Sequence, residues 1–90
     1  MKKLSIIILS YNVKKLLLDC LASIGQHRDW EIIVADNGST DGTTKAVKQA
    51  FSTGGNLGFA AGNNVGIKKS AGEFILLLNP DTIVYPNTIE

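Results

Sequence analysis

Two apolar runs in this 90-residue sequence end in groups of acid and amide side chains. Residues 32–35 are followed by Asp36 and Asn37, and residues 74–78 are followed by Asn-Pro-Asp at 79–81. Buried strands of parallel sheets read as continuous apolar runs, and open α/β sheets bind ligands beyond the carboxyl ends of their strands. The position of Asp81 therefore predicts a carboxylate that holds a metal ion or a nucleotide.

The segments that must position these side chains alternate between strand and helix patterns. Apolar runs predict strands over residues 4–9, 30–35 and 73–78. Helical spacing of apolar residues predicts helices over residues 13–24, 43–51 and 59–70, with Leu16 and Ala46 among the inward positions. Asn12 is the expected cap of the first helix and Gly25 its end, whereas Gly62 and Gly66 weaken the third helix. Pro86 is expected in the first turn of a further helix.

This order predicts an α/β fold, in which helices flank a parallel sheet and right-handed crossovers join the strands. Ninety residues make one domain at most, so residues 1–90 are taken as one unit. An open sheet of about three strands would leave an exposed edge. We therefore expect a partial domain of a larger protein.

Composition excludes several classes of function. A formal net charge of +1 gives no electrostatic footprint for nucleic acid. The lone Cys20 excludes an internal disulfide and falls at an apolar helical position, which predicts a buried thiol. Ser5 interrupts the apolar stretch after Met1, so a first strand is favoured over a signal peptide. A cytoplasmic protein is expected.

Four segments in order resemble the N-terminal, nucleotide-binding part of family 2 glycosyltransferases with the Rossmann-like GT-A fold. They are residues 5–12, 34–43, 56–64 and 72–82. The motifs Asn-Leu-Gly-Phe at 56–59 and Asn-Pro-Asp at 79–81 look most like those of the rhamnosyltransferase-like branch. The resemblance implies an inverting enzyme that transfers a sugar from a UDP- or dTDP-linked donor to an acceptor hydroxyl. It also implies Mg²⁺ or Mn²⁺ as cofactor.

By this resemblance, the residues after the first two strands contact the nucleotide. Tyr11 lies against the base, or else anchors its loop. Asp36 and Asn37 hydrogen-bond the base or its ribose, although Asp36 could instead brace the turn at residues 38–40. Asp41 is expected in a structural role before the second helix.

The segment 79–81 matches the position of the family's Asp-x-Asp motif. Asp81 corresponds to the metal-binding carboxylate, its alternative being an ordinary turn aspartate. Asn79 replaces the first acid and contacts ribose or phosphate, or caps the turn. Asn64 belongs to an amide- and glycine-rich segment that leads into a helix and could bind the diphosphate, or could be a plain connector.

The sequence also departs from the family. Members usually carry a strand before the Asn-Leu-Gly segment, and no β-branched run is present between Phe51 and Asn56, so one expected strand is predicted to be missing. No catalytic base is identified within residues 1–90, so the chain alone is expected to be inactive. The parent enzyme is expected to act in the cytoplasm, with peripheral association at the inner face of the membrane as an option.

Two other functions stay open. A non-catalytic nucleotide-binding module is favoured by Asn79 in place of an acid and by the missing strand. A receiver-like signalling domain would use Asp36 as a phosphate acceptor, although residues 10–12 lack the acidic cluster that such a domain needs.

Overall fold

The computed structural model describes residues 3–55 and 57–84. Over these residues, strands and helices alternate throughout. The elements are β1 (Leu4–Ser10), α1 (Lys14–Ile24), β2 (Trp30–Asp36), α2 (Thr43–Ala46), β3 (Ala50–Ser52), α3 (Phe59–Lys69) and β4 (Phe74–Leu78).

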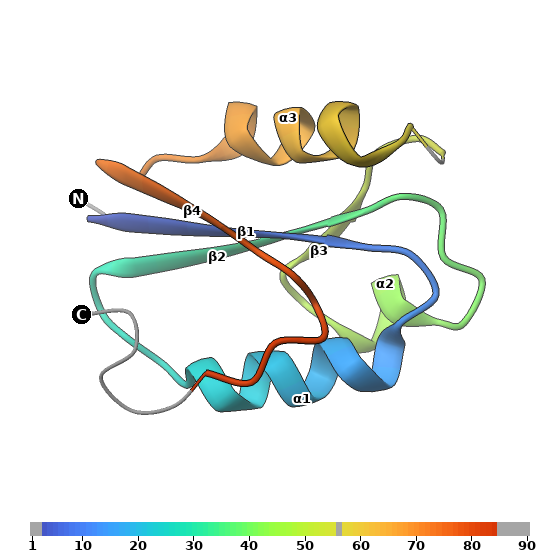
Figure 1. Ribbon diagram of the computed structural model, residues 1–90, viewed down its shortest axis with the longest axis horizontal. Helices are drawn as coiled ribbons and strands as arrows, with labels where there is room; N and C mark the ends of the chain where they lie inside the picture. The colour runs from blue at the N-terminus through green and yellow to red at the C-terminus, as the bar shows by residue number, and fades with distance from the viewer. Residues whose placement is uncertain (1–2, 56, 85–90) are drawn as a thin grey trace.

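All of these strands run parallel in one sheet, in the order β3-β2-β1-β4. Figure 1 shows α3 on one face of the sheet and α1 and α2 on the other. This arrangement confirms the predicted α/β fold with helices flanking a parallel sheet. No helix within the described residues is long and apolar enough to cross a membrane.

The core is built around β1, which lies between β2 and β4. Ile6, Ile7 and Ile8 have no exposed surface, because both faces of β1 are covered. Side chains alternate between the faces of a strand, so Ile6 and Ile8 pack with Leu17 of α1 while Ile7 faces α3. Burying each of these isoleucines contributes about 1.5–3 kcal/mol.

Gly62 and Gly66 explain how α3 packs so closely on the sheet. They are four residues apart and share one face of the helix. A Cβ on Gly62 would lie 2.5 Å from Leu9 Cδ1, and one on Gly66 would lie 2.6 Å from Ile7 Cγ2. The two glycines cost helix propensity but allow the helix backbone to approach β1.

The predictions of a helix over residues 43–51 and of a missing strand are both wrong. α2 ends at Ala46, which is exposed, and the chain becomes extended at the buried Val47. Residues 50–52 then pair with residues 34–36 of β2 as β3. Because this short segment contains no β-branched residue, its pairing with β2, rather than its own propensity, makes it a strand.

The predicted boundaries of α1 are partly correct. Gly25 ends the helix with a left-handed backbone (φ 74°), as expected. Asn12 does not cap it: the position before the helix is Val13, whose side chain makes no capping hydrogen bond. Leu16, expected on the buried face, is exposed. The helix predicted to begin at Pro86 lies outside the described residues.

Candidate functional site

The polar residues that follow β1, β2 and β4 lie at one edge of the sheet. The strands are parallel, so their carboxyl ends share that edge. Ser10 at the end of β1 pairs with Asp36 at the end of β2, and Ile8 pairs with Leu78 at the end of β4. Segments far apart in the sequence are therefore brought together here.

Asp36 is buried and braces the turn that follows β2. Only 1% of its surface is exposed. Its carboxylate accepts hydrogen bonds from the Ser10 hydroxyl at 2.7 Å, the Ser39 backbone N–H at 2.8 Å and the Ser39 hydroxyl at 2.5 Å. Asp36 thus braces the turn at residues 38–40, which was the alternative to contact with a nucleotide. A carboxylate has about four acceptor positions, so little capacity is left for a ligand.

Asn37 ties the edge to the segment that leads into α3. Its amide nitrogen donates to the Gly58 carbonyl at 3.1 Å, and its amide oxygen accepts from the Thr53 hydroxyl at 2.5 Å. Both ends of this buried amide are engaged by the protein. Asn37 therefore has a clear structural role at the place where the sequence predicts nucleotide contact.

The loops after β1 and β2 are linked to each other. The Asn12 N–H donates to the Ser39 hydroxyl at 2.8 Å, and the Asn12 side-chain oxygen accepts from the Thr40 N–H at 2.7 Å. Asn12 has a left-handed backbone (φ 53°), a conformation that asparagine tolerates better than most residues. Its side chain thus joins two loops instead of capping a helix.

Asp41 completes this link, which agrees with its predicted structural role. Its carboxylate accepts from the Lys14 N–H at 3.0 Å and from the Thr43 N–H at 3.2 Å. The hydrogen bond from the Thr43 hydroxyl is the main cause that lowers the pKa of Asp41 below its usual value.

Tyr11 follows β1 directly, and about half of its side chain is exposed (48%). An exposed ring beside the carboxyl edge is available to stack on a flat ligand. The position agrees with the predicted contact to a base, which stays a prediction.

The segment after β4 forms a β-turn that presents Asp81. The Asn79 carbonyl accepts from the Thr82 N–H at 3.1 Å, with Pro80 in the second position that proline favours. The backbone of Asn79, not its side chain, thus closes the turn. Asn79 and Asp81 are both exposed, so their side-chain oxygens are accessible.

Cys20 lies in α1, beneath this turn, and is buried as predicted. Its thiol is 3.9 Å from the Asn79 carbonyl oxygen. Burial raises the pKa of Cys20, and the negative charge of Asp81 raises it further. The charge of Asp81 therefore acts on α1 at Cys20.

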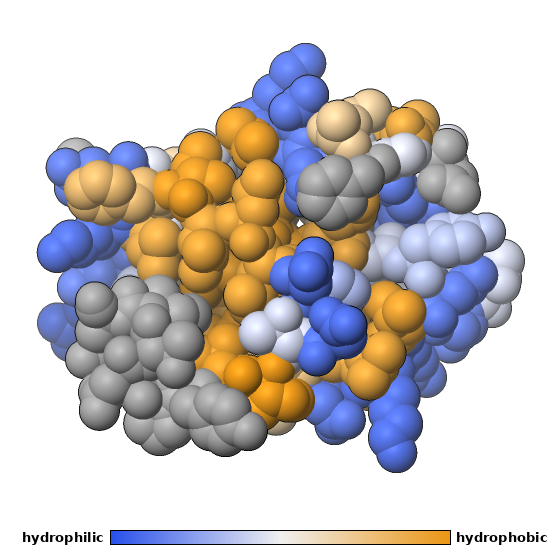
Figure 2. Space-filling model, in the orientation of Figure 1, coloured by the Kyte–Doolittle hydropathy of each residue, from blue (hydrophilic) through white to orange (hydrophobic). Residues whose placement is uncertain are grey.

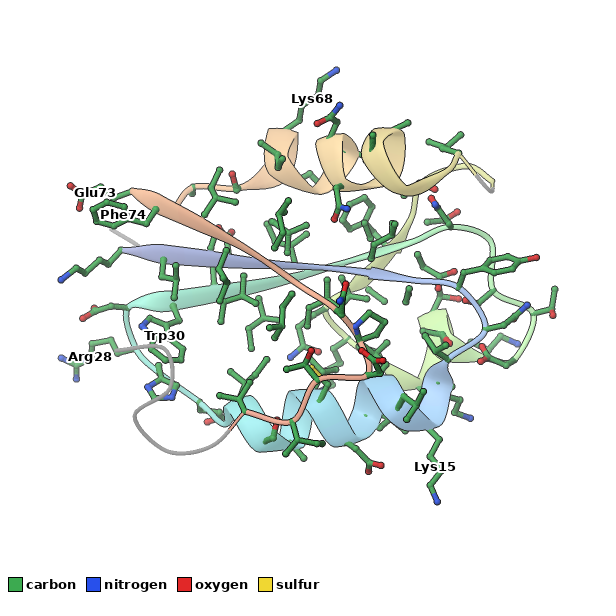
Figure 3. The ribbon with its side chains drawn as sticks, in the orientation of Figure 1. Lys15, Arg28, Trp30, Lys68, Glu73 and Phe74 are labelled. Carbon is green, nitrogen blue, oxygen red and sulfur yellow. The ribbon has the colours of Figure 1, made fainter. Side chains whose placement is uncertain are left out.

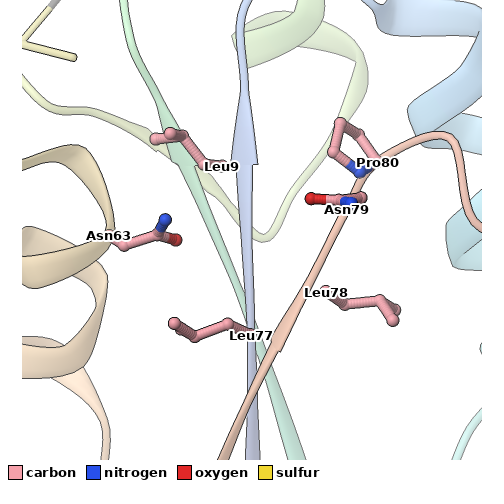
Figure 4. Close-up of a pocket in the computed structure, with 6 residues that line it drawn as sticks. All are labelled: Leu9, Asn63, Leu77, Leu78, Asn79 and Pro80. Carbon is pink, nitrogen blue, oxygen red and sulfur yellow. The ribbon is translucent and has the colours of Figure 1, made fainter. Parts of the chain in front are cut away.

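A pocket of about 190 Å³ lies between β1, β4 and α3 at the carboxyl edge. Figure 4 shows its lining, which consists of Leu9, Asn63, Leu77, Leu78, Asn79 and Pro80. Asn79 was predicted as a site residue, and the pocket includes it. The pocket makes the edge a concave surface next to the turn that carries Asp81.

Asn63, a pocket residue, belongs to the same amide- and glycine-rich segment as Asn64, but only Asn64 was predicted as a contact residue. It is 5% exposed, whereas the predicted Asn64 is exposed. Asn63 is three residues before Gly66 and therefore on the sheet-facing side of α3, while Asn64 is not. The glycine spacing was the signal that could have distinguished the two asparagines.

The described residues contain no group of three or more His, Cys, Asp or Glu side chains that could enclose a metal ion. Mg²⁺ commonly uses one or two protein carboxylates together with substrate phosphates and water. Asp81 and the side-chain oxygen of Asn79, exposed on one turn, suit that kind of shared coordination. They fit a cation that arrives with a phosphate better than one held by protein alone.

Comparison with known proteins connects this edge to a family. Residues 5–90 match the family described as Glycosyl transferase family 2. An uncharacterized glycosyltransferase of Rickettsia conorii is 33% identical over 98% of this chain and 16% of its own length. The glycosyltransferase GlyG of Streptococcus pneumoniae is 32% identical over 97% of this chain and 33% of its own length.

A teichoic acid poly(glycerol phosphate) polymerase of Staphylococcus epidermidis is 29% identical over 90% of this chain and 13% of its own length. The chain thus spans a third or less of each of these three relatives. The match to the family covers nearly all of the sequence, including β2, β3, β4, all of β1 except Leu4, and the polar segments at the carboxyl edge. The chain belongs to glycosyl transferase family 2.

Proposed function

We propose that the carboxyl edge binds the nucleoside-diphosphate sugar donor of an inverting glycosyltransferase. The family implies a nucleotide-sugar donor in general. The observation that carries the proposal is that Tyr11, the Asp36–Asn37 pair and the turn 79–82, from three separate strands, meet at one edge beside a pocket. The pocket alone is too small for a whole nucleotide sugar, so the ligand would extend over the exposed edge.

Each group has a role that its position allows. Tyr11 offers an exposed ring to the base, while the hydrogen bonds of Asp36 and Asn37 hold the neighbouring loops in shape. Asp81 and Asn79 face the place where the diphosphate would lie. A divalent cation, when bound there, would neutralise charge on the departing nucleoside diphosphate.

Within this proposal, the donor is UDP- or dTDP-linked and the parent enzyme is of the rhamnosyltransferase-like branch. It acts in the cytoplasm, with peripheral association at the inner face of the membrane as an option. The hydroxyl of the acceptor attacks the sugar directly, and the base that takes its proton is not among residues 1–90. Asn64, which is exposed, would contact the diphosphate.

A non-catalytic nucleotide-binding module is the second candidate. It is favoured by Asn79 in place of an acid, whereas its second ground, the missing strand, is removed by β3. The receiver-like alternative is disfavoured, because Asp36 is buried and its oxygens already accept three hydrogen bonds.

Calorimetry with UDP and dTDP, with and without Mn²⁺, tests the proposal. We expect metal-dependent binding that Asp81→Ala weakens at least about tenfold, since interactions with a charged group contribute about 1.5–3 kcal/mol. Glu73→Ala is the control, because Glu73 lies at the opposite end of β4 and is also exposed (Figure 3). Equal binding by the Asp81 variant and the wild type would refute the role of Asp81.

A transfer assay on the full-length protein distinguishes the two candidates. Release of the nucleoside diphosphate that depends on an acceptor supports the enzyme. Metal-dependent binding without any turnover supports the non-catalytic module.

A further inference from the structure

The segment after β4 is held against α1 at two points that lie on either side of Asp81. Figure 1 shows this segment descending from the end of β4 along α1. On one side, the Cys20 thiol is 3.9 Å from the Asn79 carbonyl oxygen. On the other, the Val84 N–H donates to the Ser23 hydroxyl at 2.8 Å.

Ser23 uses both of its hydrogen-bonding capacities in this contact. While it accepts from Val84, its hydroxyl donates to the Cys20 carbonyl at 2.7 Å. The donated bond orients the oxygen, because a hydroxyl has one proton and two lone pairs. Cys20 and Ser23 are three residues apart and so share one face of α1. Val84 also packs on the core beneath α1, which adds an apolar contact to the hydrogen bond.

We propose that Ser23 is a positioning residue that fixes the turn bearing Asp81 relative to the carboxyl edge. This inference rests on the proposed function, since it gives the anchored turn a part in binding the donor. The turn is closed by a single backbone hydrogen bond between Asn79 and Thr82, so its direction depends on what holds the chain after it. Without the bond from the Val84 N–H to Ser23, residues 82–84 leave α1 more often, and Asp81 is less often positioned to bind a cation together with a diphosphate.

The test compares Ser23→Ala with two matched variants. Ser23→Thr keeps the hydroxyl and can make the same bonds. Ser70→Ala removes a similar bond at the end of α3, where the Ser70 hydroxyl donates to the Ile67 carbonyl at 2.6 Å, far from Asp81 in the fold. All three are measured in the longest form of the protein that contains this domain.

The first measurement is amide hydrogen exchange at Val84, which reports the anchor whether or not a ligand binds. We expect Ser23→Ala to speed exchange about fivefold or more, since a hydrogen bond contributes about 1 kcal/mol net. Ser23→Thr and Ser70→Ala should leave it within twofold of the wild type. An unchanged exchange rate at Val84 in Ser23→Ala would show that Ser23 does not anchor the segment. Slow amide exchange in β1 verifies that each variant is folded.

The second measurement is the dissociation constant of UDP and dTDP with and without Mn²⁺. We expect Ser23→Ala to weaken the Mn²⁺-dependent part of binding about fivefold while leaving metal-free binding unchanged, because Tyr11 and Asp36 lie on other loops. Ser23→Thr should restore it. Equal loss with and without Mn²⁺, or no loss at all, would overturn the positioning role. If the wild type itself binds neither nucleotide, the proposed function fails, and the exchange result still decides whether the anchor exists.

Discussion

The thiol of Cys20 lies between the helix that carries it and the turn that carries Asp81. Burial is the larger cause that raises its pKa, and the negative charge of Asp81 is the smaller one. In the unfolded chain the thiol ionises near its ordinary pKa, so between the two pKa values the folded state holds the proton more tightly. The stability contributed by the neutral thiol is therefore full below the ordinary pKa and is lost as the pH rises through the folded pKa.

We expect the free energy of unfolding to fall as the pH rises above about 9, where a thiol in the unfolded state ionises. Urea titrations at a series of pH values measure this change. Cys20→Ala should be less stable at neutral pH but should lose less stability between neutral and alkaline pH than the wild type. Parallel pH profiles for the two proteins would contradict the prediction.

Sequence reasoning located the acid and amide residues of the site but not all of their contacts. Asp36, Asn37 and Asp81 could be found because each follows an apolar run, and the carboxyl ends of parallel strands meet at one edge. The hydrogen bonds of Asp36 and Asn37 could not be found, since they depend on loops that are brought together only by folding. Asn63 differs, because its spacing from Gly66 in the sequence was enough to place it on the sheet-facing side of α3.

At the scale of elements, the strands were more predictable than the short segments between them. β1, β2 and β4 were predicted within one residue at each end, because long apolar runs define buried parallel strands. β3 could not be predicted from Ala50, Phe51 and Ser52, whose strand conformation comes from pairing with β2. α2 was predicted too long, because Ala46, Val47 and Ala50 have a helical spacing that pairing with β2 overrides.

The packing of α3 predicts that Gly66→Ala destabilises the protein. Alanine favours a helix by about 1 kcal/mol over glycine. The added methyl group would overlap the buried Ile7, and overpacking of this kind costs about 1–3 kcal/mol. We therefore expect a net loss of stability, measured by thermal or urea unfolding.

Lys68→Ala is the control on the same helix, because Lys68 points away from the sheet (Figure 3). A change at such an exposed position should stay within about 0.5 kcal/mol. If Gly66→Ala were as stable as the control or more so, α3 would not be packed as closely on β1 as described.

At the scale of the whole molecule, β4 forms an edge of the sheet and carries exposed apolar side chains. Phe74 is 59% exposed, Ile75 45% and Leu77 47%. Figure 2 shows a broad apolar surface on this side of the molecule. Over the described residues β4 pairs only with β1, and an uncharged apolar edge strand favours pairing between molecules.

We expect the 90-residue chain to self-associate and Ile75→Lys to reduce that association. A lysine on an edge strand discourages pairing with another strand, and Ile75 does not line the pocket. Sedimentation velocity over a range of concentrations measures the effect. Leu57→Lys makes the same change at a leucine that is exposed to a similar extent but lies outside the sheet, so it should have less effect.

The central position of β1 also bears on how the chain reaches its fold. Leu4 pairs with Trp30 on one side and with Phe74 on the other, so the two partners are 26 and 70 positions further along the chain. The first neighbour is available early during synthesis, but the second is made only after most of the 90 residues. Contacts between such distant residues slow folding, because a long loop must close before they form. Until β4 arrives, one side of β1, the most deeply buried strand of the described residues, has no partner, and that is the interval in which a chaperone would have the most to protect.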